Sequence, residues 1–261
     1  MHATNIFEQK MLNLFRGTGI TAPEKVYLAL LTADPTDTGS VTSELNYPGY
    51  ARQEITFSAP VLGESGEMYM ENDNQIAYAE VLTSVGNALY IGLMDNMTGG
   101  DMLLYAPMAN PLDITPGTAP AFQPGAIRWT WSGLFPAAIK TNVMNTLRGT
   151  NLSGITPKLA FYNGDPAASG AEFSGGGYAR LSVTFSAPSQ DAETGDAVIS
   201  NTALTVSGSF TKNMGILSHV AIYDEATDGN LWAILPLTNA ITVKKNQTIG
   251  FVAGQLKLRA N

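Results

Sequence analysis

The sequence predicts a mainly β protein that consists of two tandem copies of a small antiparallel β-sandwich or small barrel, each preceded by a short N-terminal helix. Three observations predict this fold. Short apolar segments alternate with turns rich in the 26 glycines and 14 prolines of the 261-residue chain. The same order of motifs occurs twice along the chain. Each occurrence begins with apolar residues at helical spacing.

Matching motifs place the two copies at residues 1–132 and 133–261. Gly-Tyr-Ala-Arg begins at Gly49 and again at Gly177, and Thr-Phe-Ser-Ala-Pro begins at residue 56 and again at residue 184. The offset between matched motifs stays between 128 and 132 residues, and the order of the motifs is kept. Because several collinear matches are not expected by chance, the chain contains a duplicated unit.

Each copy is expected to begin with an amphipathic helix. The apolar faces comprise Phe7, Met11, Leu14 and Phe15 in the first copy and Ile139, Val143, Met144 and Leu147 in the second. Gly17 and Gly149 can adopt the left-handed conformation that ends a helix. We expect each helix to pack on the sandwich of its own copy, with contact to a partner protein as the alternative.

Five strands are expected in each copy. They span residues 26–31, 53–57, 88–94, 102–105 and 127–131 in the first copy, and 158–161, 181–185, 217–223, 231–235 and 255–258 in the second. Trp129 and Trp131 alternate with polar residues in the last strand of the first copy, and we interpret them as its core face. The first copy also contains an additional Pro-rich bend at residues 111–124.

Repeated turn residues form a candidate structural motif. They are Asp34, Pro35, Gly49, Tyr50 and Arg52 in the first copy, and Asp165, Pro166, Gly177, Tyr178 and Arg180 in the second. An aspartate side chain can accept a hydrogen bond from the backbone of a turn, and the following proline fixes φ. In Gly-Tyr-Ala-Arg, glycine permits a positive φ, tyrosine packs and hydrogen-bonds, and arginine can pair with a carboxylate. We interpret both motifs as structural corners, with a ligand site as the less favoured alternative.

Composition argues against several classes of protein. The formal charge of −8 is unfavourable for binding a nucleic-acid backbone. No apolar run approaches the roughly 18 residues that a membrane helix requires. The absence of cysteine excludes disulfides and thiolate metal sites. The first 15 residues lack a basic cluster followed by a continuous apolar stretch, so we expect no signal peptide.

Catalytic and metal-binding patterns are weak. His219 could form a triad with Asp224 and a serine such as Ser218 or Ser207. No Gly-x-Ser-x-Gly sequence frames any serine, so we interpret His219 as a half-buried strand residue. Acidic turns at residues 71–73 and 191–196 could hold calcium, although neither matches an EF-hand loop. We therefore expect no catalytic residue, no cofactor and no metal.

The repeated motifs resemble those of small tailed-phage virion proteins. Residues 27–37 read Tyr-Leu-Ala-Leu-Leu-Thr-Ala-Asp-Pro-Thr-Asp, and Gly-Tyr-Ala-Arg with a Thr-Phe strand follows. The second copy adds Ile-Tyr-Asp-Glu-Ala-Thr at 222–227 and Ala-Gly-Gln-Leu at 253–256, in the order found in that group. Such proteins are commonly labelled phage tail fibre or tail-associated proteins. The resemblance covers nearly all of both copies and implies a virion structural protein without catalytic residues.

Three functions are compatible with these observations: a capsid decoration or cement protein on the outside of the shell, a tail fibre or baseplate-associated protein that contacts the host, and a carbohydrate-active enzyme or lectin. No heptads or long repetitive shaft typical of fibres occur. The copies carry formal charges of −9 and +1, which suits a protein that bridges two unlike sites on a shell. We favour capsid decoration, with the tail location as the alternative. The expected partners are the major capsid protein or tail proteins and further copies of this chain, with neither nucleic acid nor membrane.

Overall fold

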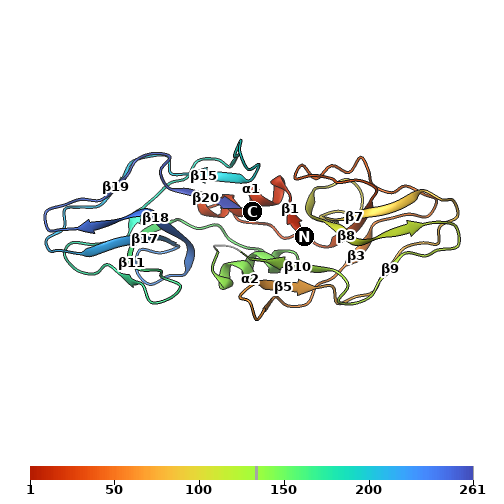
Figure 1. The fold of residues 1–261 in the computed structure, drawn as a ribbon, viewed down its shortest axis with the longest axis horizontal. Helices are drawn as coiled ribbons and strands as arrows, with labels where there is room; N and C mark the ends of the chain where they lie inside the picture. Colours follow the sequence, from red (N-terminus) through yellow and green to blue (C-terminus); the bar gives the residue numbers. More distant parts are fainter. Residues whose placement is uncertain (133–134, 261) are drawn as a thin grey trace.

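The computed structural model describes residues 1–132 and 135–260 and confirms the mainly β fold class. Residues 1–132 (the first half) and 135–260 (the second half) form β-rich bodies at opposite ends of an elongated molecule, with both helices near the middle (Figure 1). Both chain termini also lie in this middle region (Figure 1). The sheets of the described residues are open and antiparallel, so the barrel alternative is not the fold that they form. Residue 133, where the second copy is predicted to start, lies outside the described residues.

The first half contains three sheets. A five-stranded sheet has the order β1-β8-β7-β2-β3, a three-stranded sheet has the order β10-β5-β4, and β6 pairs with β9. The bounds of these strands are β1 His2–Ala3, β2 Val26–Leu31, β3 Gln53–Ile55, β4 Val61–Leu62, β5 Met68–Glu71, β6 Ile76–Ala77, β7 Gly86–Met94, β8 Met102–Ile114, β9 Ala121–Phe122 and β10 Arg128–Trp131.

The second half repeats this arrangement. Its large sheet has the order β12-β11-β17-β18 with β13 also paired to β11, its three-stranded sheet has the order β14-β15-β20, and β16 pairs with β19. The bounds of these strands are β11 Lys158–Asn163, β12 Ala171–Glu172, β13 Leu181–Ser182, β14 Ser189–Gln190, β15 Ala197–Ser200, β16 Thr205–Val206, β17 Gly215–Tyr223, β18 Leu231–Val243, β19 Gly250–Phe251 and β20 Lys257–Ala260.

All ten predicted strands are present; the strand at 26–31 has the predicted ends, and the other nine differ at one or both ends. The largest differences are in β8 and β18, which continue to Ile114 and Val243 instead of ending at residues 105 and 235. The predicted Pro-rich bend at 111–124 therefore begins inside β8. Beyond β7, the other neighbour of β8 is β1, which covers only Leu104 and Tyr105. Pro107 thus lies where β8 is an edge strand, a position at which proline is tolerated.

The two predicted helices and their glycine ends are also present. Helix α1 (Asn5–Asn13) continues as a 3-10 turn over Leu14–Arg16 and ends at Gly17, whose φ is 82°. Helix α2 (Ala137–Thr146) is followed by Gly149, whose φ is 85°. The Thr4 hydroxyl caps α1 by accepting a hydrogen bond from the Phe7 amide at 3.5 Å. The left-handed glycines stop each helix and turn the chain toward the next strand.

The helices do not pack only on their own copies, so that expectation is wrong. Helix α1 contacts β15 and β20 of the second half as well as β8 of the first, and α2 contacts β5. One continuous apolar core accordingly runs through both halves. Trp129 and Trp131 belong to this core with exposures of 3% and 7%, which confirms their predicted role. Because the duplicated sheets offer similar apolar surfaces, helical periodicity alone cannot decide which sheet receives which helix.

Candidate functional site

The middle of the molecule, called the joint from here on, is built by backbone from both halves. The Ile20 amide donates to the Leu152 carbonyl at 2.7 Å, and the Leu152 amide donates back to the Ile20 carbonyl at 3.0 Å. Glycine is required on either side of this crossing: a Cβ at Gly19 would lie 2.6 Å from the Leu152 oxygen, and one at Gly154 would lie 2.3 Å from the Gly17 carbonyl carbon. These two glycines therefore permit the two halves to approach at backbone distance.

Side chains also cross the joint. Phe15, at the end of α1, is 1% exposed. Its ring lies edge-on to Phe185 and Trp232 of the second half, with centroid distances of 6.4 and 5.9 Å. In the other direction, Arg148 Nε donates to the Phe57 carbonyl of the first half at 3.1 Å. Each half thus completes part of the core or the backbone pairing of the other.

Glu8 is a buried acid of the joint. One carboxylate oxygen accepts from the Ala197 amide of β15 at 2.9 Å. Burial raises the pKa of Glu8 to about 7; the Ala197 hydrogen bond opposes this shift, and the nearby carboxylates of Asp196 and Asp37 add to it. Glu8 also lines a cavity of about 340 Å³ beside Trp129. The protonation of this residue therefore changes near neutral pH at a contact between α1 and the second half.

The matching position in the second half carries the opposite charge. Lys140 lies 132 residues after Glu8, on α2, and is 5% exposed. Burial lowers the pKa of Lys140. The duplication has therefore placed one buried acid and one buried base at equivalent helix positions.

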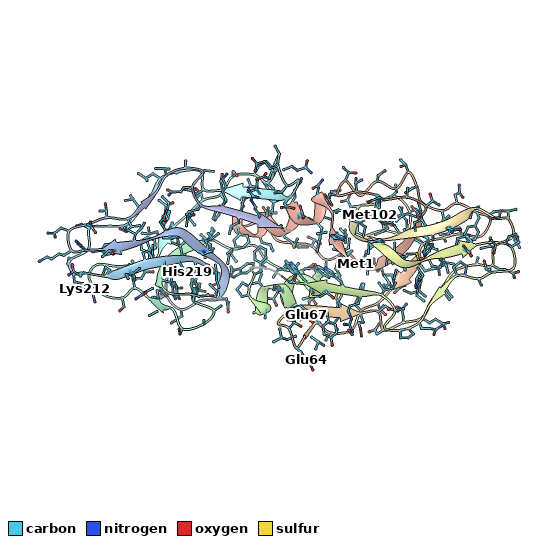
Figure 2. All side chains as sticks on the ribbon, viewed as in Figure 1. Met1, Glu64, Glu67, Met102, Lys212 and His219 are labelled. Carbon is cyan, nitrogen blue, oxygen red and sulfur yellow. The ribbon has the colours of Figure 1, made fainter. Side chains whose placement is uncertain are left out.

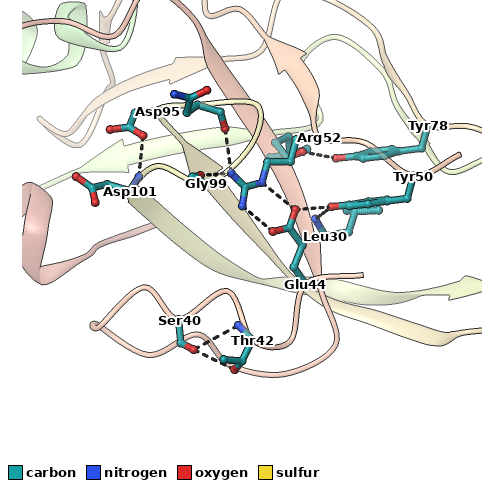
Figure 3. A network of polar contacts seen from close by, with 12 residues as sticks. Leu30, Ser40, Thr42, Glu44, Tyr50, Arg52, Tyr78, Asp95, Gly99 and Asp101 are labelled. Carbon is teal, nitrogen blue, oxygen red and sulfur yellow. Dashed lines mark hydrogen bonds and ion pairs between the residues drawn. The ribbon is translucent and has the colours of Figure 1, made fainter. Parts of the chain in front are cut away.

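The predicted Tyr and Arg residues converge on one carboxylate in each half, an arrangement called the brace from here on. In the first half, Arg52 donates from Nε and Nη2 to the two oxygens of Glu44 at 2.8 and 2.7 Å (Figure 3). The Tyr50 hydroxyl donates to Glu44 at 3.1 Å and accepts the amide of a β2 residue at 3.1 Å. Arg52 Nη1 donates to the carbonyls of Asn96 and Gly99 at 2.9 and 2.5 Å. The brace therefore links two loops, the β2–β3 connection and the β7–β8 turn, to β2 of the large sheet.

The second half repeats the brace. Arg180 donates from Nε and Nη2 to Glu172 at 2.9 and 2.8 Å, and the Tyr178 hydroxyl donates to Glu172 at 2.8 Å. Burial raises the pKa of Glu172, but hydrogen bonds from Arg180 and Tyr178 lower it more, so that its pKa lies below the ordinary value. The Arg180 guanidinium also lies 3.6 Å from the centroid of the Tyr223 ring.

Sequence reasoning missed the carboxylates of the brace. Glu44 and Glu172 each precede the paired arginine by eight residues, and this spacing, which is the same in both copies, could have identified them. A second missed pair is Asn72 and Asn201, which are 2% and 1% exposed. Their amide oxygens accept from backbone amides at 2.8 and 2.9 Å in equivalent loops of the two halves.

The repeated Asp-Pro residues start turns. Asp34 accepts from the Thr36 amide and Asp165 accepts from the Ala167 amide, each at 2.8 Å. Pro35 and Pro166 follow these aspartates, outside the brace contacts. The glycines that open the Tyr-Arg motif have φ angles of 89° at Gly49 and 81° at Gly177.

The candidate catalytic residues Ser218, His219 and Asp224 do not form a triad. Ser218 Oγ lies 3.0 Å from His219 Nδ1 and accepts from the Gly164 amide at 2.7 Å. The Asp224 carboxylate instead accepts from the Trp232 indole at 3.2 Å. The serine and the aspartate are therefore used in local backbone and side-chain contacts.

One carboxylate of each acidic turn pairs with an arginine. Glu71 pairs with Arg128 and Asp191 pairs with Arg259, each at 2.5 Å. Across residues 1–132 and 135–260, no group of three or more histidine or acidic side chains is arranged to hold a metal ion. In the same residues, no helix has the length and apolar character of a membrane span.

Comparison with known families matches both halves to one family model. Residues 2–130 and again residues 136–259 match the family described as podophage GP4 fiber I protein gp80. No curated protein matches the chain. The double match covers nearly the whole sequence and confirms the resemblance to tailed-phage virion proteins. The chain therefore belongs to the podophage GP4 fiber I protein gp80 family and is a phage virion protein.

Proposed function

We propose that the chain is a non-enzymatic structural subunit of a podophage fibre. The observation that carries this proposal is the match of both halves to a family of fibre proteins. The brace residues, which are the most strongly repeated polar side chains, bind one another and backbone carbonyls. Residues that hold loops in place suit a building block of an assembly.

The shape of the molecule supports the same proposal. The two β-rich halves point in opposite directions from a joint that contains both termini (Figure 1). Because the core and the backbone pairing continue through the joint, the halves are expected to move as one elongated body. We propose that residues 1–132 and 133–261 are two copies of one unit and that the joint turns them into a single rod-like module.

Capsid decoration is the second candidate, and a specific observation favours it. The formal charges of −9 and +1 on the two copies suit attachment to two unlike surfaces of a shell. In either location the chain would bind other virion proteins through many small contacts, whose affinities combine when the subunit is held at several points.

Quantitative mass spectrometry of purified particles distinguishes the two locations. We expect a copy number close to that of tail proteins, together with gold-labelled antibody at fibres in electron micrographs. A copy number of the same order as the major capsid protein, with antibody distributed over the shell, would replace the fibre proposal by capsid decoration. Absence of the protein from purified particles would contradict both locations.

A further inference from the structure

A ribbon at the edge of the second half carries an exposed aliphatic face. The second-half ribbon comprises residues 203–212 and 244–253 and contains β16 and β19, in which Val206 lies opposite Gly250. Strand alternation places Leu204, Val206 and Val252 on its outer face, with exposures of 61%, 47% and 61%. Leu204 and Val206 flank Gly250, so that a Cβ there would lie 3.5 and 3.4 Å from their side-chain carbons. The three side chains form one apolar surface.

Three lysines gather at one end of this ribbon. Lys212 ends one of the two chain segments of the ribbon, and Lys244 and Lys245 begin the other. The Lys245 amide donates to the Asn213 side chain at 2.9 Å, which brings the two segments together. Lys212 lies at the far end of the second half (Figure 2). All three are exposed, and none pairs with an acid within the described residues. The second-half ribbon contains no aspartate or glutamate.

The equivalent ribbon of the first half has different chemistry on the same backbone ladder. The first-half ribbon comprises residues 74–83 and 115–124, in which β6 pairs with β9 as β16 pairs with β19. Gln75, Ala77 and Gln123 stand where the second half has its aliphatic face. The only charged residue of the first-half ribbon is Glu80, and Leu82 beside it is 65% exposed. The surfaces therefore diverged while the pairing was kept.

We infer that the second-half ribbon binds the first-half ribbon of another copy of this chain, head to tail. The lysines would face Glu80 and the exposed Asp113, which lies in β8 two residues before the second segment of the first-half ribbon, and the aliphatic face would cover Leu82. Contact between two second-half ribbons would offer these lysines no acidic partner, because that ribbon contains no aspartate or glutamate. The ribbons lie toward opposite ends of the long axis (Figure 1), so this contact continues from copy to copy in a row rather than closing a pair.

The aromatic residues of the ribbon favour a protein partner over a lipid surface. Proteins that contact a membrane are enriched in exposed aromatic side chains at the interface. Phe210 and Phe251, the aromatic residues of the second-half ribbon, are 1% and 3% exposed. The outer face is aliphatic only. The inference goes beyond the proposed function and does not depend on it, because its test uses the purified chain alone.

Sedimentation velocity of the full chain, as a concentration series at low and high salt, tests this contact. We expect self-association at about 50 mM salt that weakens about tenfold or more at 500 mM. A variant with Lys212→Glu, Lys244→Glu and Lys245→Glu should remain monomeric, and so should one with Glu80→Lys and Asp113→Lys. Mixing the two variants should restore association, because each then carries the charge that the other requires.

The controls separate this contact from general charge effects. A variant with Arg16→Glu and Lys25→Glu changes the net charge in the same direction outside the ribbons and should associate as the natural chain does. A natural chain that stays monomeric, self-association unaffected by the lysine changes, or a mixture that stays monomeric would each overturn the inference. Lysine-dependent binding to vesicles containing phosphatidylglycerol, without self-association, would replace it by a lipid contact. Circular dichroism verifies that every variant is folded.

Discussion

The two halves have the same brace, but they differ at the joint and on their outer ribbons. Glu44 and Glu172 each bind a tyrosine and a bidentate arginine in nearly the same geometry. The helix positions at the joint carry Glu8 in one half and Lys140 in the other, and the outer ribbons differ in charge and apolar surface. The comparison teaches that duplication preserved what holds each unit together, while the surfaces that contact another unit were free to change.

The largest expected effect comes from Phe15, because this side chain completes the core of the opposite half. Phe15→Ala should lower the free energy of unfolding by about 3–5 kcal/mol, the range for buried phenylalanine. Hydrogen exchange should increase in β15 and β20 of the second half, on which α1 packs. Leu147→Ala at the matching position of α2 should cost about 2–5 kcal/mol and increase exchange in β5 instead. Increased exchange limited to each helix's own half would contradict the crossed packing.

The brace arginines should show the next largest effect. Arg52→Ala leaves Glu44 partly buried without its cation, which should cost about 3 kcal/mol. Arg180→Ala should have a similar cost, with an added loss from its contact with Tyr223. Denaturant midpoints measure both changes. Lys25→Ala breaks an exposed pair with Glu54 and should cost much less than either arginine substitution. Equal costs at all three positions would show that the brace has no special role in stability.

Much of this fold could be predicted from the sequence because strand and turn signals are local. The segments at 26–31 and 217–223 are apolar and end at turns, and both are strands. The packing of each helix on the small sheet of the opposite half could not be predicted, because the apolar faces of α1 and α2 fit either small sheet. The tyrosine and the arginine of the brace were predicted, because they stand together in one motif. Their glutamate was not predicted, because it lies eight residues before the arginine, in a loop whose path only the folded chain defines.

Because Glu8 is acidic and Lys140 is basic, substitutions at these two positions of the joint should change stability with different pH profiles. The folded-state pKa of Glu8 lies above its ordinary value of 4.5, at about 7. The folded state therefore holds the proton more tightly, and stability falls as pH rises from 4.5 to 7 and stays lower above that. Glu8→Gln should remove this loss and stabilise the protein by about 2 kcal/mol at pH 8, with little change at pH 5.

Lys140→Gln is the matched control for this pH profile. Burial lowers the pKa of Lys140 from an ordinary value of 10.5, which is far above the window in which Glu8 titrates. The penalty of burying the ammonium is therefore present throughout, and the substitution should change stability by the same amount at pH 5 and pH 8. Thermal unfolding measured at several pH values compares the two variants. A flat difference for Glu8→Gln would show that Glu8 does not titrate differently in the folded chain.

The smallest expected effect concerns the Asp-Pro turns, where the halves are almost alike. Asp34→Ala and Asp165→Ala each remove one hydrogen bond to a turn amide, worth about 1 kcal/mol. Asp34 also accepts from the Tyr90 hydroxyl at 3.3 Å, a contact at the long end of the range, so the loss of this hydrogen bond should add very little. Denaturant midpoints of the two variants should therefore differ very little. Asp34 and Asp165 are exposed in both halves. A large difference would therefore mean that one of these loops is held by the rest of its half, and that the division into a preserved interior and a variable surface is too simple.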